Sequence, residues 1–261
     1  MYHKKEPVVE ALFLCLVITF FVQIFQMALP LFFLADDYHD NQVILNEETS
    51  RHIAQVLRMQ YGSFIQLTDG KGRLLDAEIN EAHKKRTIVK IIKEQAIPVT
   101  SKRITIAISP IKNTSRFEWF LEKATEIGVN EIIPLICQRT EKEKLRISRL
   151  QQILVSAMLQ SRQVWLPVLH EPATFSQLME NAVYEKKYIA HCEEEMRKNL
   201  ADERQSNLDR ILMLVGPEGD FTPGEINQAR DKSFIAVTLG DNRLRTETAG
   251  VVAATLLRLN H

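Results

Sequence analysis

The chain has 261 residues, of which 45% are hydrophobic and 25% are charged, so its composition is that of an ordinary globular protein. The 33 lysines and arginines balance the 33 aspartates and glutamates, which excludes a global basic field for nucleic acid. Three widely spaced cysteines without C-x-x-C spacing argue against a disulfide framework or a zinc site and suit a reducing, cytoplasmic compartment. The histidines also lack ligand spacing, so no metal is expected.

The first 26 residues form an unusual apolar extension. Residues 8–25 are almost continuously apolar and follow Lys4 and Lys5, as in a short membrane span or a signal peptide. Glu10 is costly inside such a span, and a strand-like run opens at Met27. We therefore predict that translation begins at Met27 and that residues 1–26 are not translated. The alternative is a true membrane anchor.

Residues 27–97 are rich in predicted strands. Asn46 is a good N-cap for one amphipathic helix, predicted over Asn46–Arg58. Asp69-Gly70 predicts a hairpin turn, because glycine takes the positive φ that such a turn requires. Short strands at this spacing favour a small β-barrel. The predicted strands are Leu31–Leu34, Phe64–Thr68, Leu74–Ile79 and Ile88–Ile92.

A linker over Ala96–Arg103 precedes a second pattern, in which strands alternate with helices over residues 98–261. This alternation predicts a parallel sheet covered on both faces by helices. Strands are expected at Ile104–Ser109, Glu131–Ile136, Tyr188–His191, Ile211–Val215 and Phe234–Leu239. Helices are expected at Arg116–Ile127, Ile147–Gln163, Pro223–Lys232 and Thr246–Leu259.

Two glycine-bearing turns follow the last two of these strands. The first turn reads Gly216-Pro217-Glu218-Gly219, and the second begins at Leu239-Gly240. Glycine lets backbone donors and acceptors approach a ligand closely, so two such turns at the carboxyl ends of neighbouring strands predict a nucleotide-like ligand. The pattern G-x-G-x-x-G is absent. Thr246 is predicted to cap the final helix, whose small residues are also explained by close packing alone.

These segments carry a resemblance to a known family. The first turn, together with Leu239-Gly240 and Leu244-Arg245-Thr246-Glu247-Thr248-Ala249, resembles the signature of the RsmE family of the SPOUT class. The run Lys123-Ala124-Thr125-Glu126-Ile127-Gly128-Val129 and the run Ala157-Met158-Leu159-Gln160-Ser161 are similar to further family elements. The resemblance extends from about Met27 to Leu259. Members are uracil-N3 methyltransferases of 16S ribosomal RNA.

The resemblance implies an α/β protein with an N-terminal PUA-like barrel (residues 27–97) and a SPOUT methyltransferase domain (residues 98–261). It also implies a deep trefoil knot, which is rare in proteins, and a homodimer. The implied cofactor is S-adenosylmethionine. The residues that match the family's cofactor site are Leu214, Gly216, Glu218, Gly219, Leu239, Gly240, Leu244 and Arg245. This chain departs from the family at Asp220, where a second glycine is usual. A carboxylate there would repel the methionine carboxylate, point to water, or favour the sulfonium charge.

The implied reaction is attack of uracil N3 on the cofactor's methyl group. The site must then assist loss of the N3 proton and stabilise charge on O2 and O4. Arg116 and Arg245 are candidates for holding the base or a phosphate, and Glu126 or Glu218 for accepting the proton. The alternative for Arg116 and Glu126 is an ordinary amphipathic helix.

The implied substrate is 16S rRNA or the assembled 30S subunit, with a flipped uracil. Basic stretches at residues 84–93 and 139–149 are candidates for phosphate contacts, or are simply solvated faces. Three other functions remain open. The chain could be another SPOUT methyltransferase, acting on tRNA or on a ribose hydroxyl. It could be a non-catalytic RNA-binding dimer, or a membrane-tethered protein.

Overall fold

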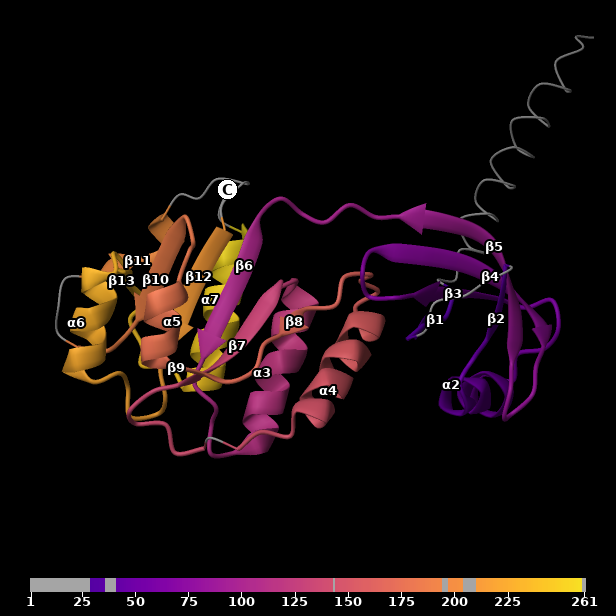
Figure 1. Ribbon diagram of the computed structural model, residues 1–261, viewed down its shortest axis with the longest axis horizontal. Helices are drawn as coiled ribbons and strands as arrows, with labels where there is room; N and C mark the ends of the chain where they lie inside the picture. The colour runs from indigo at the N-terminus through magenta and orange to yellow at the C-terminus, as the bar shows by residue number, and fades with distance from the viewer. Residues whose placement is uncertain (1–28, 36–40, 143, 194–196, 204–209, 260–261) are drawn as a thin grey trace, which may run out of the picture. The chain divides into compact units, whose positions relative to one another are not determined.

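The computed structural model describes residues 29–35, 41–142, 144–193, 197–203 and 210–259 (Figure 1). The apolar extension and the predicted start at Met27 lie outside these residues. Among the described residues, no helix is long and apolar enough to cross a membrane. The chain forms two compact units. The first comprises the described residues up to Leu67 together with Leu75–Glu94, and the second comprises Thr68–Leu74 and the chain from Gln95 onward.

A five-stranded sheet builds the first unit, in the order β1-β3-β4-β5-β2. Its strands are β1 (Leu31–Phe33), β2 (Gln42–Ile44), β3 (Phe64–Thr68), β4 (Arg73–Glu81) and β5 (Ile88–Ala96). Alternate side chains of β4, such as Ala77 and Ile79, are buried in a separate hydrophobic core. The sequence missed β2, because a three-residue strand with one buried side chain, Val43, shows no periodic pattern.

The predicted helix of this unit is present but changes its winding. Helix α2 (Glu47–Arg51) continues directly as a π-helix over His52–Val56. The Asn46 side chain accepts a hydrogen bond from the backbone N of Thr49 at 2.8 Å, which confirms the predicted N-cap. The wider winding was not expected, because hydrophobic periodicity does not separate an α-turn from a π-turn.

The second unit is built on an eight-stranded sheet. Seven strands form the path β11-β13-β10-β12-β6-β7-β8, and β9 pairs with β7. Every pairing recorded between these strands is parallel, which confirms the predicted parallel sheet. The strands are β6 (Arg103–Ile108), β7 (Glu131–Ile136), β8 (Val168–Leu169), β9 (Ala173–Thr174), β10 (Lys186–Ala190), β11 (Lys198–Asn199), β12 (Arg210–Val215) and β13 (Ile235–Thr238). The short strands β8, β9 and β11 were not predicted.

Helices cover both faces of this sheet, as expected (Figure 1). They are α3 (Thr114–Ile127), α4 (Ile147–Gln160), α5 (Phe175–Asn181), α6 (Pro223–Asp231) and α7 (Thr246–Leu259), and α5 was not predicted. Alternate residues of β12 enter different cores. Met213 packs with residues of α3, α4 and α7, whereas Leu212 and Leu214 pack with residues of α5 and α6. Two apolar faces explain why β12 is apolar along nearly its whole length.

Candidate active site

The two glycine turns lie at the same edge of the sheet, because β12 and β13 are parallel to the strand between them. They do not follow neighbouring strands, and that expectation is wrong. Strand β10 lies between β12 and β13 and pairs with both. Strand β10 comes earlier in the chain than β12 and β13, so the order of strands along the sequence does not reveal that it lies between them. The end of β10 therefore adds a third segment to the site.

A cavity of about 590 Å³ opens where these three strands end. It is lined by Arg116, Ala190, His191, Cys192, Arg197, Val215, Gly216, Pro217, Glu218, Asp220, Val237, Thr238, Leu239, Gly240, Asp241, Asn242, Arg243, Leu244, Arg245, Thr246, Glu247 and Ala249. The cavity is large enough for a cofactor-sized ligand and mixes apolar side chains with backbone polar groups and charges.

The first turn is compact because it folds back on Phe221. A Cβ atom at Gly216 would lie 3.0 Å from the Phe221 ring, so a larger residue would displace this buried side chain. The backbone N of Asp220 donates to the Pro217 carbonyl at 2.9 Å and closes the turn. Asp220 adopts φ 63°, in the left-handed region that favours glycine.

Both oxygens of the Asp220 carboxylate accept backbone hydrogen bonds. Oδ2 accepts from the N of Cys192 at 2.7 Å, and Oδ1 accepts from the N of Phe221 at 2.8 Å. The first bond joins the turn after β12 to the segment after β10. The structure thus gives this carboxylate a role that the sequence did not suggest: it bridges two walls of the cavity.

The second turn is tied to the first through helix α7. Gly240 has φ 129°, and its carbonyl accepts a hydrogen bond from the Thr238 hydroxyl at 2.7 Å. Thr246 is the first residue of α7, and its hydroxyl donates to the Gly216 carbonyl at 3.1 Å. Arg245 takes the N-cap position, since its carbonyl accepts from the N of Ala249 at 2.7 Å. Thr246 thus links the two turns, and its predicted role as N-cap is wrong.

The loop after β7 supports the first turn from outside the cavity. Arg139 Nη1 donates to the Gly219 carbonyl at 2.7 Å and more weakly to that of Phe221 at 3.4 Å. Glu225, at the start of α6, accepts from the backbone N of Gln138 at 2.8 Å and forms a capping box with Thr222. These bonds connect the first turn to the loop after β7 and to the start of α6.

Most of the predicted site residues lie on the cavity. Gly216, Glu218, Leu239, Gly240, Leu244, Arg245 and Arg116 all line it. Leu214 lies inside β12 and is fully buried in the same core cluster as Phe221, so it does not line the cavity. Gly219 is exposed and is not among the lining residues, and its carbonyl is held by Arg139.

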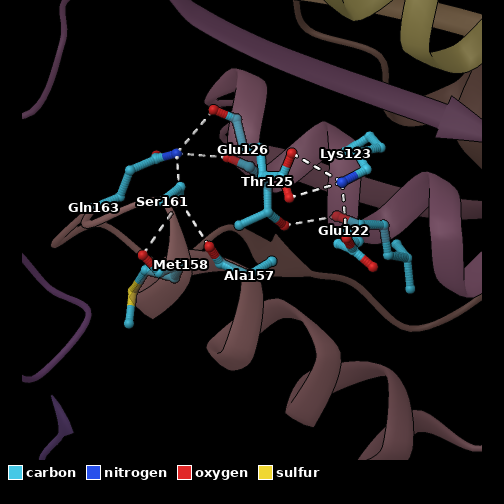
Figure 2. Close-up of polar contacts among 9 residues, drawn as sticks. Glu122, Lys123, Thr125, Glu126, Ala157, Met158, Ser161 and Gln163 are labelled. Atoms are coloured by element: carbon cyan, nitrogen blue, oxygen red, sulfur yellow. Dashed lines mark hydrogen bonds and ion pairs between the residues drawn. The ribbon is translucent and has the colours of Figure 1, made fainter. Parts of the chain in front are cut away.

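Glu126 is the predicted site residue that the fold places elsewhere. It lies near the C-terminal end of α3, whereas Arg116 lies near the N-terminal end. Figure 2 shows its carboxylate paired with Lys123 Nζ at 3.0 Å, and this lysine also pairs with Glu122. Gln163 Nε2 donates to the Thr125 and Glu126 carbonyls at 2.7 and 3.1 Å, which satisfies the end of the helix. Glu126 therefore belongs to a helix-end network, and the structure does not bring it to the cavity.

The sequence missed the contribution of β10 and the pairing of Glu247 with Arg116. His191, Cys192 and Arg197 line the cavity, and Arg197 Nη1 donates to the His191 carbonyl at 2.5 Å. Glu247 is buried and lies 3.7 Å from Arg116 Nε, measured to Oε1. The apolar run that ends at His191 could have indicated that the residues after β10 belong to the site, because ligands bind at the carboxyl ends of strands in open α/β sheets.

Two family models show that this protein, with its parallel sheet and its cavity at the strand ends, is an RNA methyltransferase with a PUA domain. An RNA methyltransferase domain matches residues 98–258, and an RNA methyltransferase PUA domain matches residues 45–92. The Ribosomal RNA small subunit methyltransferase E of Synechocystis is 32% identical over 236 residues, covering 88% of this chain and 77% of that protein. The chain belongs to this ribosomal RNA small subunit methyltransferase E family, the RsmE family.

Two solved structures support the same conclusion. The Ribosomal RNA small subunit methyltransferase E from Neisseria gonorrhoeae, bound to S-adenosyl methionine, is 31% identical with a TM-score of 0.77. The alignment covers 87% of this chain and 95% of that one. A protein from Porphyromonas gingivalis, described as a "probable rRNA-methyltransferase", is 37% identical with a TM-score of 0.80, covering 87% and 95% of the two chains.

Proposed function

We propose that this protein transfers the methyl group of S-adenosylmethionine to RNA of the small ribosomal subunit. The observation that carries the proposal is the meeting of both glycine turns in one cavity. The Neisseria gonorrhoeae relative binds S-adenosyl methionine in the same overall fold. The chain is therefore an S-adenosylmethionine-dependent rRNA methyltransferase.

The cofactor residues are assigned within this proposal. The turns around Gly216 and Gly240 hold the adenosine through main-chain groups, with Leu239 and Leu244 providing apolar contact. Glu218 lines the same cavity with an exposed carboxylate, which complements the positive sulfonium. Leu214 and Gly219 act indirectly, by supporting the first turn.

The acceptor atom in this proposal is N3 of one uridine in 16S rRNA. N3 attacks the methyl carbon, the carbon–sulfur bond breaks, and its electrons remain on sulfur as S-adenosylhomocysteine leaves. The N3 proton passes to Glu218 or to water. Arg116 and Arg245 hold the base or a phosphate and stabilise charge on the uracil oxygens. Glu218 is preferred over Glu126, because only Glu218 lines the cavity.

Methyl transfer to isolated subunits tests the function. We expect labelled methyl from S-adenosylmethionine to enter 30S particles or free 16S rRNA, and nuclease digestion with mass spectrometry to identify one N3-methyluridine. A label found in tRNA, or on a ribose hydroxyl, would instead support the other SPOUT activities. RNA binding without any cofactor binding in calorimetry would support a non-catalytic RNA-binding protein.

The finer architecture is part of the same proposal. It comprises a barrel over residues 27–97, a SPOUT domain over residues 98–261 with a deep trefoil knot, and a homodimer. The knot is carried over from the resemblance to the SPOUT class. Light scattering after size-exclusion chromatography tests the dimer, and a monomeric mass at micromolar concentration would contradict it. A crystallographic chain trace tests the knot.

A further inference from the structure

A second pocket lies beside the cofactor cavity, between the first turns of α3 and α7. It has a volume of about 340 Å³ and is lined by Asn113, Ser115, Arg116, Trp119, Glu247 and Thr248. We call it the Trp119 pocket. Arg116 and Glu247 also line the larger cavity, so the two hollows meet at this ion pair. A group bound in the Trp119 pocket would therefore lie next to a cofactor.

Trp119 gives this pocket a flat aromatic surface. Its side chain is 41% exposed, although Phe117 and Phe120 on the same helix are fully buried. Trp119 lies one helical turn after Arg116, so the two side chains are neighbours on α3. An aromatic ring beside a guanidinium is the combination on which an unpaired nucleobase stacks, and such stacking contributes ~1–3 kcal/mol per base.

The charges of the pocket suit a base that becomes negative. Helices α3 and α7 both begin here, each with 14 residues, so the positive ends of two dipoles converge. The Arg116 guanidinium is held 3.7 Å from the buried Glu247 carboxylate and remains 43% exposed. Uracil presents an O2 acceptor, an N3 donor and an O4 acceptor on one edge. Arginine donors match the two oxygens, where charge gathers once N3 loses its proton.

We propose that the Trp119 pocket binds the target uracil, with Trp119 stacking on the base and Arg116 holding a carbonyl oxygen. Glu247 is a positioning residue that fixes the guanidinium where the two hollows meet. The inference rests on the proposed function and identifies where that function's substrate base is held. With Arg116 on O4, it predicts a preference for uracil over cytosine, because cytosine keeps O2 but replaces the O4 acceptor with an amino donor.

Fluorescence of the full chain tests the pocket without catalysis. The chain has two tryptophans, Trp119 and Trp165. With S-adenosylhomocysteine present, we expect uridine 5′-monophosphate to quench the fluorescence of the native chain and of the matched control Trp165→Phe. It should not quench Trp119→Phe, and cytidine 5′-monophosphate should quench less. Absence of quenching at tens of millimolar nucleotide, or quenching that persists in Trp119→Phe, would overturn the inference.

Kinetics on 30S subunits provide the second test. We expect Trp119→Ala to lower kcat/KM by ~5- to 150-fold, which is the loss of one stacked base. Trp119→Phe should stay within ~3-fold because it keeps an aromatic face. Both variants should bind S-adenosylmethionine as the native chain does, which shows that the cofactor cavity is intact. Native kcat/KM in Trp119→Ala would overturn the inference. If the native chain transfers no methyl to rRNA, the proposed function fails, whereas the fluorescence result still decides whether the pocket binds uracil.

Discussion

The carboxylate of Asp220 accepts a hydrogen bond from the backbone N of Cys192 at 2.7 Å and thereby joins two walls of the cavity. Asp220 holds a left-handed φ of 63°, which costs a non-glycine residue ~1–2 kcal/mol. Two backbone hydrogen bonds to its charged carboxylate offset that cost. Where glycine would make the turn easier, the aspartate instead provides a connection to the segment after β10.

Replacement of Asp220 tests this connection. We expect Asp220→Gly to relieve the backbone strain but weaken S-adenosylmethionine binding by ~3- to 30-fold, since a hydrogen bond to a charged group contributes ~1.5–3 kcal/mol and the freed loop recovers part of it. The affinity of Asp220→Asn for S-adenosylmethionine should lie between those of the native chain and Asp220→Gly, because its amide oxygen can still accept the hydrogen bond from the backbone N of Cys192. Calorimetric titration measures both affinities. Equal or tighter binding by Asp220→Gly would show that the connection does not organise the cavity.

Two cysteines should differ sharply in alkylation. Cys192 is exposed and lines the cavity, whereas burial, with the nearby Glu225 carboxylate, raises the pKa of the Cys137 thiol well above its usual range. We expect iodoacetamide to label Cys192 in the folded protein and Cys137 only in urea, because the thiolate is the reactive form. S-adenosylmethionine should slow labelling of Cys192. Peptide mass spectrometry follows each site, and an unchanged rate with saturating cofactor would place the ligand away from β10.

Gly250 should tolerate no larger side chain. A Cβ atom there would lie 2.6 Å from the Phe120 ring and 2.8 Å from Ile108 Cδ1, because α7 packs closely on α3 and β6. We expect Gly250→Val to lower the free energy of unfolding by ~1–3 kcal/mol, the usual cost of overpacking. Urea denaturation measures this change.

Gly224 provides the matched control in another helix. A Cβ atom there meets nothing nearer than the Thr222 hydroxyl at 4.0 Å. Gly224→Ala should therefore be neutral or stabilising by up to ~1 kcal/mol, because alanine favours helix more than glycine does. If both variants behave alike, close packing does not explain the glycine in α7.

Asp69 should make the β3–β4 turn sensitive to acid. Partial burial alone would raise the pKa of its carboxyl, but hydrogen bonds from the Arg73 side chain and from the backbone N of Lys71 and Arg73 outweigh this and lower the pKa below its usual 3.8. A lowered folded-state pKa stabilises the fold above pH 3.8, and this contribution is lost as pH falls through the folded value. Asp69→Asn should therefore reduce stability at pH 7 and lose less of it on acidification. Parallel acid-titration curves for the two proteins would contradict this.

Glu126 shows that a family motif does not place a residue in the site. Its run of residues matches the family, but the match does not tell which end of α3 faces the ligand. Arg116 and Glu126 lie on one helix of 14 residues, about 15 Å apart along its axis at 1.5 Å per residue. Only the end near Arg116 meets the strand ends. Arg116 therefore lines the cavity, whereas Glu126 forms an ion pair with Lys123.

The sequence by itself determined the parallel α/β pattern, the two glycine turns, seven of the residues that line the cavity and the family. These features are local: they depend on apolar periodicity, on turn chemistry and on motifs read along the chain. Only the tertiary structure decided that β10 stands between β12 and β13, that Asp220 contacts Cys192, and that Trp119 and Glu247 share a pocket. Such pairs are far apart in the chain, and strand order and helix packing set their distance, which no local pattern encodes.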